Sequence, residues 1–207
     1  MSKIVVLGAG ISGHTAAAHL RRKLSKEHEV LVVSPNRNYQ WVPSNIWVGI
    51  GRMKSKEVIF PLEPLYKRKG IGYKQAKAVS FHPEGDSSEA KPYILVEGVF
   101  GDNLGKQEKV TYDYLINATG PKLAFDMTEG LQPATNKVYS VCTYDHAEHA
   151  SEALHKLIDQ LQTSDKTANI LIGTGHAKAT CQGAAFEYML NVEKELQKFG
   201  VRDKAEI

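Results

Sequence analysis

Short apolar runs alternate with amphipathic stretches along the first part of the chain. Residues 4–7 (Ile-Val-Val-Leu) predict a buried strand, residues 13–26 a helix, and residues 30–33 a second buried strand. A strand, a helix and a strand in this order predict a parallel sheet with a right-handed crossover. Residues 34–51 contain two prolines among polar and aromatic residues, so we expect a long functional loop there.

The middle of the chain has the pattern of an antiparallel sheet. Residues 73–81, 93–99 and 108–112 read as strands, and the glycines and Asn between 101 and 105 predict a turn. These segments predict a small antiparallel insertion at about 73–112. Residues 114–118 then return as a buried strand.

A second set of elements follows a loop rich in Pro, Gly and Asn. Residues 138–141 predict a strand, Thr143 is a candidate helix N-cap, and the chain should end with a strand at 168–172 and a helix at 177–199. The helix after Thr143 places its apolar residues on one stripe, which indicates contact with a core. They are Ala147, Ala150, Leu154, Leu157, Ile158 and Leu161. We expect two domains, 1–125 and 126–207, the second truncated after one strand-helix unit.

Composition excludes several classes of protein. The chain has 207 residues, 42% of them hydrophobic, and a net charge of +3 that is spread over short clusters, so nucleic-acid binding is not expected. Two cysteines do not make a disulfide scaffold. No run approaches the roughly 18 apolar residues of a membrane span, and the N-terminus does not read as a secretory signal.

The first strand leads into a glycine turn, Gly8-Ala9-Gly10-Ile11-Ser12-Gly13. Gly8 permits the tight turn, Gly10 lets a pyrophosphate approach the backbone, and Gly13 lets the helix pack closely on the strand. This spacing predicts a Rossmann-like dinucleotide-binding domain. The second strand lacks the usual acidic residue at its end and continues into Ser34-Pro35-Asn36-Arg37, which could form a simple β-turn or contribute polar contacts.

Another segment favours FAD over NAD as the dinucleotide. The buried strand at 114–118 ends in Ala118-Thr119-Gly120-Pro121, and such small residues allow close approach of the chain to a cofactor. A later glycine turn, Gly173-Thr174-Gly175, lacks a third glycine, and Cys181 follows it. This turn is interpreted as one converted from nucleotide binding to thiol chemistry.

Taken together, these motifs resemble the sulfide:quinone oxidoreductases of the flavoprotein disulfide reductase superfamily. The resemblance includes Trp41-Val42-Pro43-Ser44-Asn45, the segment from Ser140 to Ala147, and Cys181-x-Gly183-x-x-x-Glu187. It implies an α/β fold with a Rossmann-like FAD-binding domain, and FAD-dependent oxidation of sulfide with transfer of electrons to membrane quinone. The implied FAD contacts are Gly8, Gly10, Ile11, Ser12, Gly13, Ser34, Pro35, Asn36, Arg37, Pro43, Ser44, Ala78, Val79, Ala118, Thr119, Gly120 and Pro121.

The resemblance also implies the reactive residues and the partners. Cys181 matches one of two redox cysteines, Cys142 matches a further cysteine near the flavin, and His146 and Glu187 match residues that handle protons. The second redox cysteine, the quinone site and the region that seats the enzyme on a membrane surface belong to the remaining half of such enzymes. We therefore expect a peripheral membrane protein as the intact enzyme, with a homo-oligomer as a further possibility.

Alternatives remain for each reactive residue. The helix macrodipole favours a thiolate at Cys181, but either cysteine could be a small packing residue, or Cys142 and Cys181 could form a disulfide. Glu187 lies six residues, or about 240°, from Cys181 on an ideal helix, so a surface carboxylate is the other interpretation. His149 and His155 lie near His146, but their spacing does not predict a metal site.

Two alternative functions are set against sulfide oxidation. One is a type II NADH:quinone dehydrogenase, which would need an intact second glycine fingerprint. The other is a non-catalytic flavin-binding module.

Overall fold

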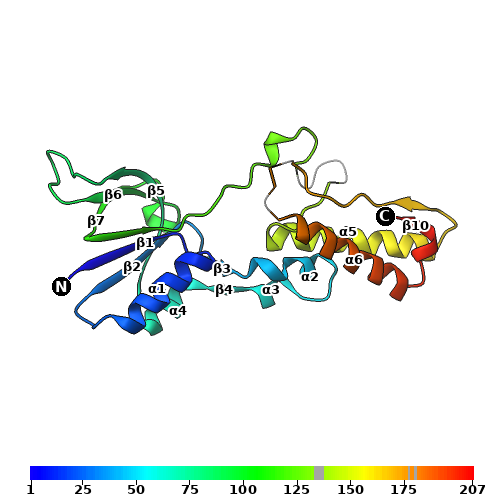
Figure 1. Cartoon of the computed structure of the whole chain (residues 1–207), viewed down its shortest axis with the longest axis horizontal. Helices are drawn as coiled ribbons and strands as arrows, with labels where there is room; N and C mark the ends of the chain where they lie inside the picture. The colour runs from blue at the N-terminus through cyan, green and yellow to red at the C-terminus, as the bar shows by residue number, and fades with distance from the viewer. Residues whose placement is uncertain (133–137, 177, 180) are drawn as a thin grey trace. The chain divides into compact units, whose positions relative to one another are not determined.

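The computed structural model describes residues 1–132, 138–176, 178–179 and 181–207. The chain forms two compact units, one of residues 1–40 with 60–122 and the other of residues 41–59 with 123–207 (Figure 1). Residues 41–59 therefore belong to the second unit, although the chain returns to the first unit for residues 60–122.

A six-stranded mixed sheet forms the centre of the first unit, with the order β7-β6-β5-β2-β1-β8. Strands β1, β2, β5 and β8 run parallel, whereas β6 and β7 are antiparallel to their neighbours. The strands are β1 (Lys3–Leu7), β2 (Glu29–Ser34), β5 (Gly72–His82), β6 (Tyr93–Gly98), β7 (Gln107–Thr111) and β8 (Tyr114–Asn117). This arrangement confirms the predicted α/β class, with a Rossmann-like parallel part and an antiparallel insertion.

The alternation of side chains along β1 and β2 supplies two cores. Val6, Val30 and Val32 pack with residues of α1 (Ile11–Lys23) and α4 (Leu62–Lys69), whereas Val5 and Leu7 pack in a cluster that includes residues of β6 and β7. A strand buried on both faces reads as a continuous apolar run, which is why residues 4–7 and 30–33 were recognisable in the sequence.

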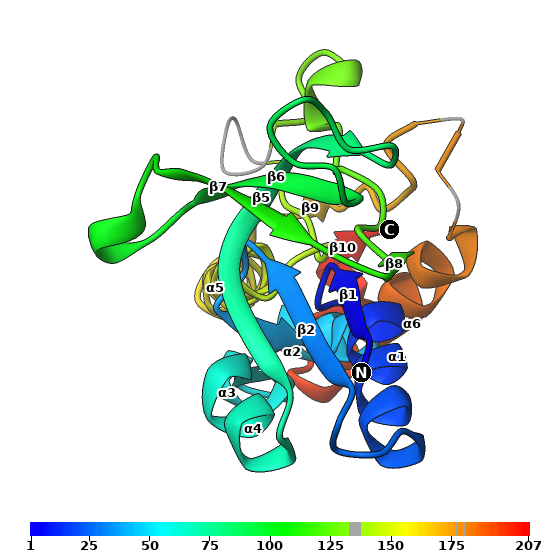
Figure 2. The ribbon, with the colours of Figure 1, turned by 90° about the vertical axis from the view of Figure 1, so that its left-hand side faces the viewer.

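Strand β5 joins the parallel and antiparallel parts of this sheet. Its first residues pair with β2 and its later residues pair with β6, with a bulge between Ala78 and Ser80. Figure 2 shows β5 as a long curved strand beside β2. A β-bulge increases the local twist and bending of its strand, so this bulge contributes to the curvature of β5.

Two short strands, β3 (Asn38–Gln40) and β4 (Ile59–Pro61), form a separate two-stranded sheet. Between them the chain contributes η1 (Val42–Ser44), α2 (Asn45–Gly49) and α3 (Ser55–Val58) to the second unit. The predicted loop at 34–51 was wrong in this part. Ile46, Val48 and Ile50 are buried, and this apolar burial stabilises helical structure despite the neighbouring Pro43.

The second unit is built mainly from two long helices, α5 (Tyr144–Gln162) and α6 (Gln182–Lys198). A two-stranded parallel sheet, β9 (Ala168–Asn169) and β10 (Ala205–Glu206), contributes to the same core. The predicted stripe of α5 is confirmed, because Ala147, Ala150, Leu154, Ile158 and Leu161 are buried and Leu157 packs against them. The remaining short helices are η2 (Gly101–Asn103), η3 (Phe125–Met127) and η4 (Arg202–Lys204).

Three predicted elements of the second half differ from the structure. Residues 138–141 are not a strand, and Val141 instead packs in an apolar cluster with residues of α2, α3 and α5. The strand predicted at 168–172 stops at Asn169, because its partner β10 offers only two residues for pairing. The helix predicted at 177–199 begins at Gln182, while Ala177 lies outside the described residues.

None of the described helices has the length and apolar character needed to cross a membrane.

Candidate functional site

Gly8 and Gly13 allow three elements of the first unit to approach one another. Gly8 has φ of +92°, its N–H donates to the carbonyl of Val33 at 2.8 Å, and a Cβ at Gly8 would lie 2.2 Å from the carbonyl oxygen of Ala118. A Cβ at Gly13 would lie 2.1 Å from the carbonyl oxygen of Gly8. No side chain fits at either position, so both glycines are required by packing between β1, α1 and β8.

Gly10 has a different environment from its two neighbours in the motif. No atom lies within 4 Å of a Cβ placed there, so the backbone is open on this side. Gly10 is the N-cap of α1 and supplies no side-chain hydrogen bond, and the first turn of α1 carries no acidic residue. The first N–H groups of a helix lack internal partners and the helix dipole is positive there. This arrangement fits the pyrophosphate of a dinucleotide.

The turn after β2 is held in place by hydrogen bonds. The Oγ of Ser34, which is 1% exposed, accepts from the N–H of Asn36 at 3.3 Å. From β5, the hydroxyl of Tyr73 donates to the carbonyl of Asn36 at 2.6 Å, and the amide of Gln75 donates to the carbonyl of Pro35 at 3.3 Å. Burial, together with nearby Glu63, raises the pKa of Tyr73 to about 12 although Arg37 opposes the shift. The turn is therefore fixed beside the end of β2.

The segment after β8 lies against the glycine turn through Ala118. The N–H of Ala118 donates to the carbonyl of Leu7 at 2.8 Å, and the hydroxyl of Thr119 donates to Oδ1 of Asn117 at 2.9 Å. Gly120 has φ of +69°, a conformation that favours glycine. Pro121 and Val79 are exposed, and Val79 lies at the bulge of β5. In this unit the chain brings together Gly8, Gly13 and Ala118, which are among the predicted dinucleotide contacts.

His14 lies one turn into α1 and is surrounded by aromatic rings. Its ring centroid is 5.0 Å from that of Tyr39, 5.7 Å from that of Phe60 and 5.6 Å from that of Tyr66. Nδ1 of His14 is 3.1 Å from the hydroxyl of Tyr66. Burial lowers the pKa of His14, and the positive charge of Lys69 lowers it further. The sequence analysis missed this cluster, because its members are distant in the chain and have no motif.

In the second unit, Cys181 is the N-cap residue of α6. It is exposed and not in a disulfide, and the first turn of α6 has no acidic residue. The preceding turn is held by the hydroxyl of Thr128, which donates to the carbonyl of Gly175 at 3.0 Å. Because α6 begins only at Gln182, the glycines at 173 and 175 do not open the helix directly, unlike those of the first unit.

Cys142 and His146 lie at the start of α5. Cys142 is exposed and free, and its N–H donates to the hydroxyl of Ser140 at 3.1 Å. The ring of His146 meets that of Phe125 edge-on, with 5.3 Å between centroids, and its Nδ1 is buried without a hydrogen-bond partner among the described residues. Buried polar atoms are usually hydrogen-bonded, so this nitrogen could exchange a hydrogen bond with a bound group.

Gly49, in α2, contacts two segments that carry predicted site residues, one next to Cys142 and the other next to Glu187. A Cβ at Gly49 would lie 2.7 Å from Cγ1 of Val141 and 3.0 Å from Cε2 of Tyr188, and the Tyr188 hydroxyl donates to the Gly49 carbonyl at 3.1 Å. Val141 precedes Cys142, and Tyr188 follows the exposed Glu187. Burial raises the pKa of Tyr188 to about 12, so this phenol remains protonated near neutral pH. The sequence analysis did not identify Tyr188 or Gly49.

Pro43 and Ser44 lie in η1, and their predicted contact with FAD stays a prediction. The described residues contain no group of three or more His, Cys, Asp or Glu side chains arranged to hold a metal ion. No disulfide joins Cys142 to Cys181 in this structure.

Comparison with known proteins places this geometry in a family. The model for pyridine nucleotide-disulphide oxidoreductases matches residues 2–188. The sulfide-quinone reductase of Aquifex aeolicus is 28% identical over 201 residues, which are 97% of this chain and 41% of that protein. The mitochondrial external alternative NAD(P)H-ubiquinone oxidoreductase B4 of Arabidopsis thaliana is 31% identical over 159 residues, or 76% of this chain and 25% of that protein.

A solved structure gives the same assignment. The X-ray structure of the sulfide:quinone oxidoreductase from Aquifex aeolicus matches with a TM-score of 0.75 and 26% identity, over 99% of this chain and 42% of that one. The chain thus spans less than half the length of these relatives, and its expected resemblance to sulfide:quinone oxidoreductases is confirmed. With a family model that covers residues 2–188, the chain belongs to the pyridine nucleotide-disulphide oxidoreductases.

Proposed function

We propose that this chain binds FAD and forms part of an enzyme that oxidises sulfide and passes the electrons to membrane quinone. The observation that carries the proposal is the exposed Cys181 at the N-cap of α6, in a chain whose first glycine turn fits a dinucleotide. A reactive cysteine at this position suits sulfur chemistry better than nucleotide binding.

The residues of the first unit fit the proposed cofactor. The open backbone at Gly10 and the uncapped start of α1 would bind the pyrophosphate of FAD. The fixed turn from Ser34 to Arg37 would lie toward the adenosine half, where the Ser34 hydroxyl still has a proton to donate. Bound flavin would supply a two-electron acceptor, which the side chains of the protein cannot provide.

Cys181 is the residue proposed to react with sulfide. Hydrosulfide would attack a disulfide between Cys181 and a second cysteine that the resemblance assigns to the rest of such enzymes. One sulfur–sulfur bond breaks as another forms, which leaves a persulfide on one cysteine and a thiolate on the other. The positive end of the α6 dipole favours the negatively charged sulfur at Cys181.

Three further residues have supporting roles in the proposal. Nδ1 of His146, buried and unpaired within the described chain, is suited to hold or pass a proton. Cys142 would lie near the flavin, and Glu187 would act through solvent because its side chain is exposed. The intact enzyme would be a peripheral membrane protein, because its proposed acceptor is dissolved in the bilayer.

NADH:quinone oxidoreduction is the second candidate, because the NAD(P)H-ubiquinone oxidoreductase B4 of Arabidopsis thaliana is 31% identical to this chain. NADH would need a phosphate site at the second glycine turn. Here α6 begins at Gln182, well after Gly175, whereas α1 begins directly after Gly10, so this glycine turn does not lead straight into the first N–H groups of a helix. This difference favours sulfide as the electron donor.

Anaerobic visible spectroscopy tests the proposal. The chain is joined to the remaining half of a sulfide:quinone oxidoreductase, which supplies the second cysteine. The product is loaded with FAD, freed of excess cofactor, and then mixed with either sulfide or NADH. We expect bound flavin whose visible absorption is bleached by sulfide and not by NADH, and we expect Cys181→Ser to retain the flavin but to lose the bleaching. Bleaching by NADH alone would establish the second candidate, and bound flavin that ignores both donors would indicate a non-catalytic flavin-binding module.

A further inference from the structure

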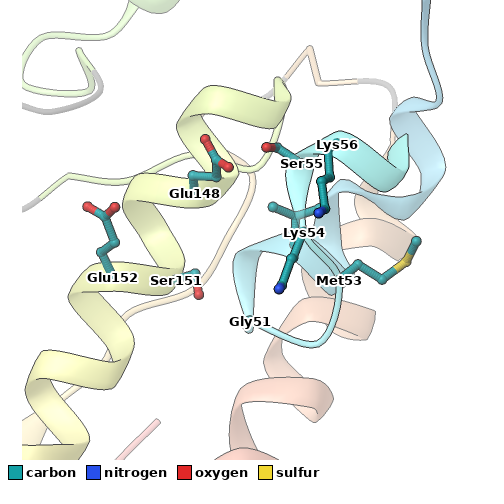
Figure 3. A pocket seen from close by; sticks show the side chains of 9 residues that line it. Gly51, Met53, Lys54, Ser55, Lys56, Glu148, Ser151 and Glu152 are labelled. Atoms are coloured by element: carbon teal, nitrogen blue, oxygen red, sulfur yellow. The ribbon is translucent and has the colours of Figure 1, made fainter. Parts of the chain in front are cut away.

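A pocket of about 440 Å³ lies within the second unit, separate from the cysteines and the glycine turns. One wall is helix α5, and the other is the segment that runs from the end of α2 into α3 (Figure 3). Ligand pockets usually have volumes between about 300 and 1,000 Å³, so this one can hold a small molecule.

The two walls of the pocket carry opposite charges. Glu148, Ser151 and Glu152 project from α5, whereas Lys54 and Lys56 project from the opposite wall (Figure 3). No ion pair joins the two walls in the described part of the chain. Acidic and basic groups therefore face one pocket without neutralising each other.

The two carboxylates of the acidic wall lie on the same face of their helix. Glu148 and Glu152 are four residues apart on α5, and like charges at this spacing repel each other. Neither carboxylate belongs to an ion pair among the described residues. A bound cationic group between them would relieve the repulsion.

The shape of the pocket depends on a close backbone approach at Gly51. Gly51 has φ of +75°, and a Cβ there would lie 2.5 Å from Cε1 of His155 and 2.9 Å from Oγ of Ser151. The backbone oxygen of Ser151 lies 2.8 Å from Nδ1 of His155, which fixes that ring beside the turn. Val48, which is 1% exposed, is an apolar residue of the lining. These contacts keep the two walls at a defined separation.

We propose that this pocket binds a small zwitterion, namely an amino acid or a short peptide with free ends. The ammonium group lies between Glu148 and Glu152, and the carboxylate faces Lys54 and Lys56. The hydroxyl of Ser151 serves as a neutral hydrogen-bonding group between the two ends. This site goes beyond the proposed sulfide chemistry and does not require flavin.

Isothermal titration calorimetry with three matched probes tests the charge requirement. The probes are triglycine, N-acetyl-triglycine, which lacks the ammonium group, and triglycine amide, which lacks the carboxylate. We expect triglycine to bind the full chain at pH 7 at least tenfold more tightly than either capped probe. Equal affinities for the three probes, or no binding of triglycine at millimolar concentration, would overturn the proposal.

Paired substitutions locate the site. Glu148→Gln with Glu152→Gln should abolish the preference for triglycine over N-acetyl-triglycine, and Lys54→Gln with Lys56→Gln should abolish the preference over triglycine amide. Asp159→Asn with Asp165→Asn and Lys166→Gln with Lys194→Gln change the net charge by the same amounts at exposed positions outside the pocket, and should leave all three affinities within twofold. If these control pairs reduced binding as much as the pocket pairs, the ligand would be responding to overall charge and the assignment of the pocket would be wrong.

Discussion

Arg52 and Glu195 form an ion pair that spans 143 residues of sequence within the second unit. Nε of Arg52 donates to Oε1 of Glu195, whose side chain is 2% exposed, and Nζ of Lys198 lies 3.8 Å from the other carboxylate oxygen. Arg52 follows α2 and Glu195 belongs to α6. The pair therefore fastens the segment 41–59 to a helix formed much later in the chain.

Removal of Arg52 should strongly destabilise the protein. Arg52→Ala leaves the buried carboxylate of Glu195 without its main partner, and loss of one member of a buried pair costs about 3–5 kcal/mol. We expect a loss of about 3 kcal/mol in the free energy of unfolding, near the low end of that range, because Arg52 is partly exposed and Lys198 is close. Urea denaturation followed by circular dichroism measures it.

A double variant distinguishes charge burial from packing. Arg52→Met with Glu195→Leu removes both charges and keeps similar volumes, so it should recover most of the lost stability. If the double variant were as unstable as Arg52→Ala, the stabilising role of the pair would lie in its hydrogen bonds.

Substitutions within the first glycine turn should separate folding from cofactor binding. Gly13→Ala places a methyl group against the carbonyl of Gly8 and should lower the melting temperature of the chain itself. In Gly10→Val the added Cβ has no protein atom within 4 Å, so the melting temperature should stay within a few degrees of wild type while the affinity for FAD falls at least tenfold. Differential scanning fluorimetry and flavin fluorescence titration provide the two readouts. An unchanged FAD affinity in Gly10→Val would contradict the proposed pyrophosphate position.

The His14 cluster should make stability depend on pH. The pKa of His14 is lowered in the fold from its usual 6.5, so the unfolded chain binds the proton more readily. The stabilising contribution of neutral His14 is complete above pH 6.5 and is lost as the pH falls toward the lower pKa of the folded state. His14→Phe should therefore show a smaller drop in melting temperature than wild type between pH 7.5 and 5.5. Parallel curves for the two proteins would mean that other groups cause the acid sensitivity.

The two cysteines should react at different rates although both are exposed. Cys181 lies at the positive end of α6, whereas Cys142 precedes the N-cap of α5 and is followed by Asp145 in the first turn of that helix. We expect iodoacetamide at pH 7 to alkylate Cys181 several-fold faster than Cys142, as followed by peptide mass spectrometry. Rates that are equal, or that favour Cys142, would remove the argument that the start of α6 makes Cys181 the more reactive cysteine.

Local sequence patterns were sufficient for the parallel sheet and for the turn at Gly8–Gly13. Those elements are specified by nearby residues: apolar runs define β1 and β2, and the glycine spacing follows from the contact of one turn with one helix. The stripe of α5 was equally clear, because its apolar residues recur at helical intervals.

The parts that were missed depend on contacts between distant residues. Whether residues 45–49 form a helix depends on the apolar surface that they bury against α5. No pattern inside residues 34–51 indicates that α5 will pack against them. The cluster around His14 joins residues 39, 60 and 66 to α1, and Tyr188 meets Gly49 across 139 residues. The roles of Cys142, His146, Cys181 and Glu187 rest on the resemblance and on their positions, and they stay predictions.

The discontinuity of the second unit has a consequence for synthesis on the ribosome. Residues 41–59 emerge long before α5 and α6, which cover Val48, Ile50 and Val58 in the finished protein. At roughly 5–20 residues per second, the nascent chain would expose these apolar side chains for several seconds or more. During that interval they offer a binding site for a holdase chaperone, so translation speed over residues 60–160 should influence how much of the protein escapes aggregation.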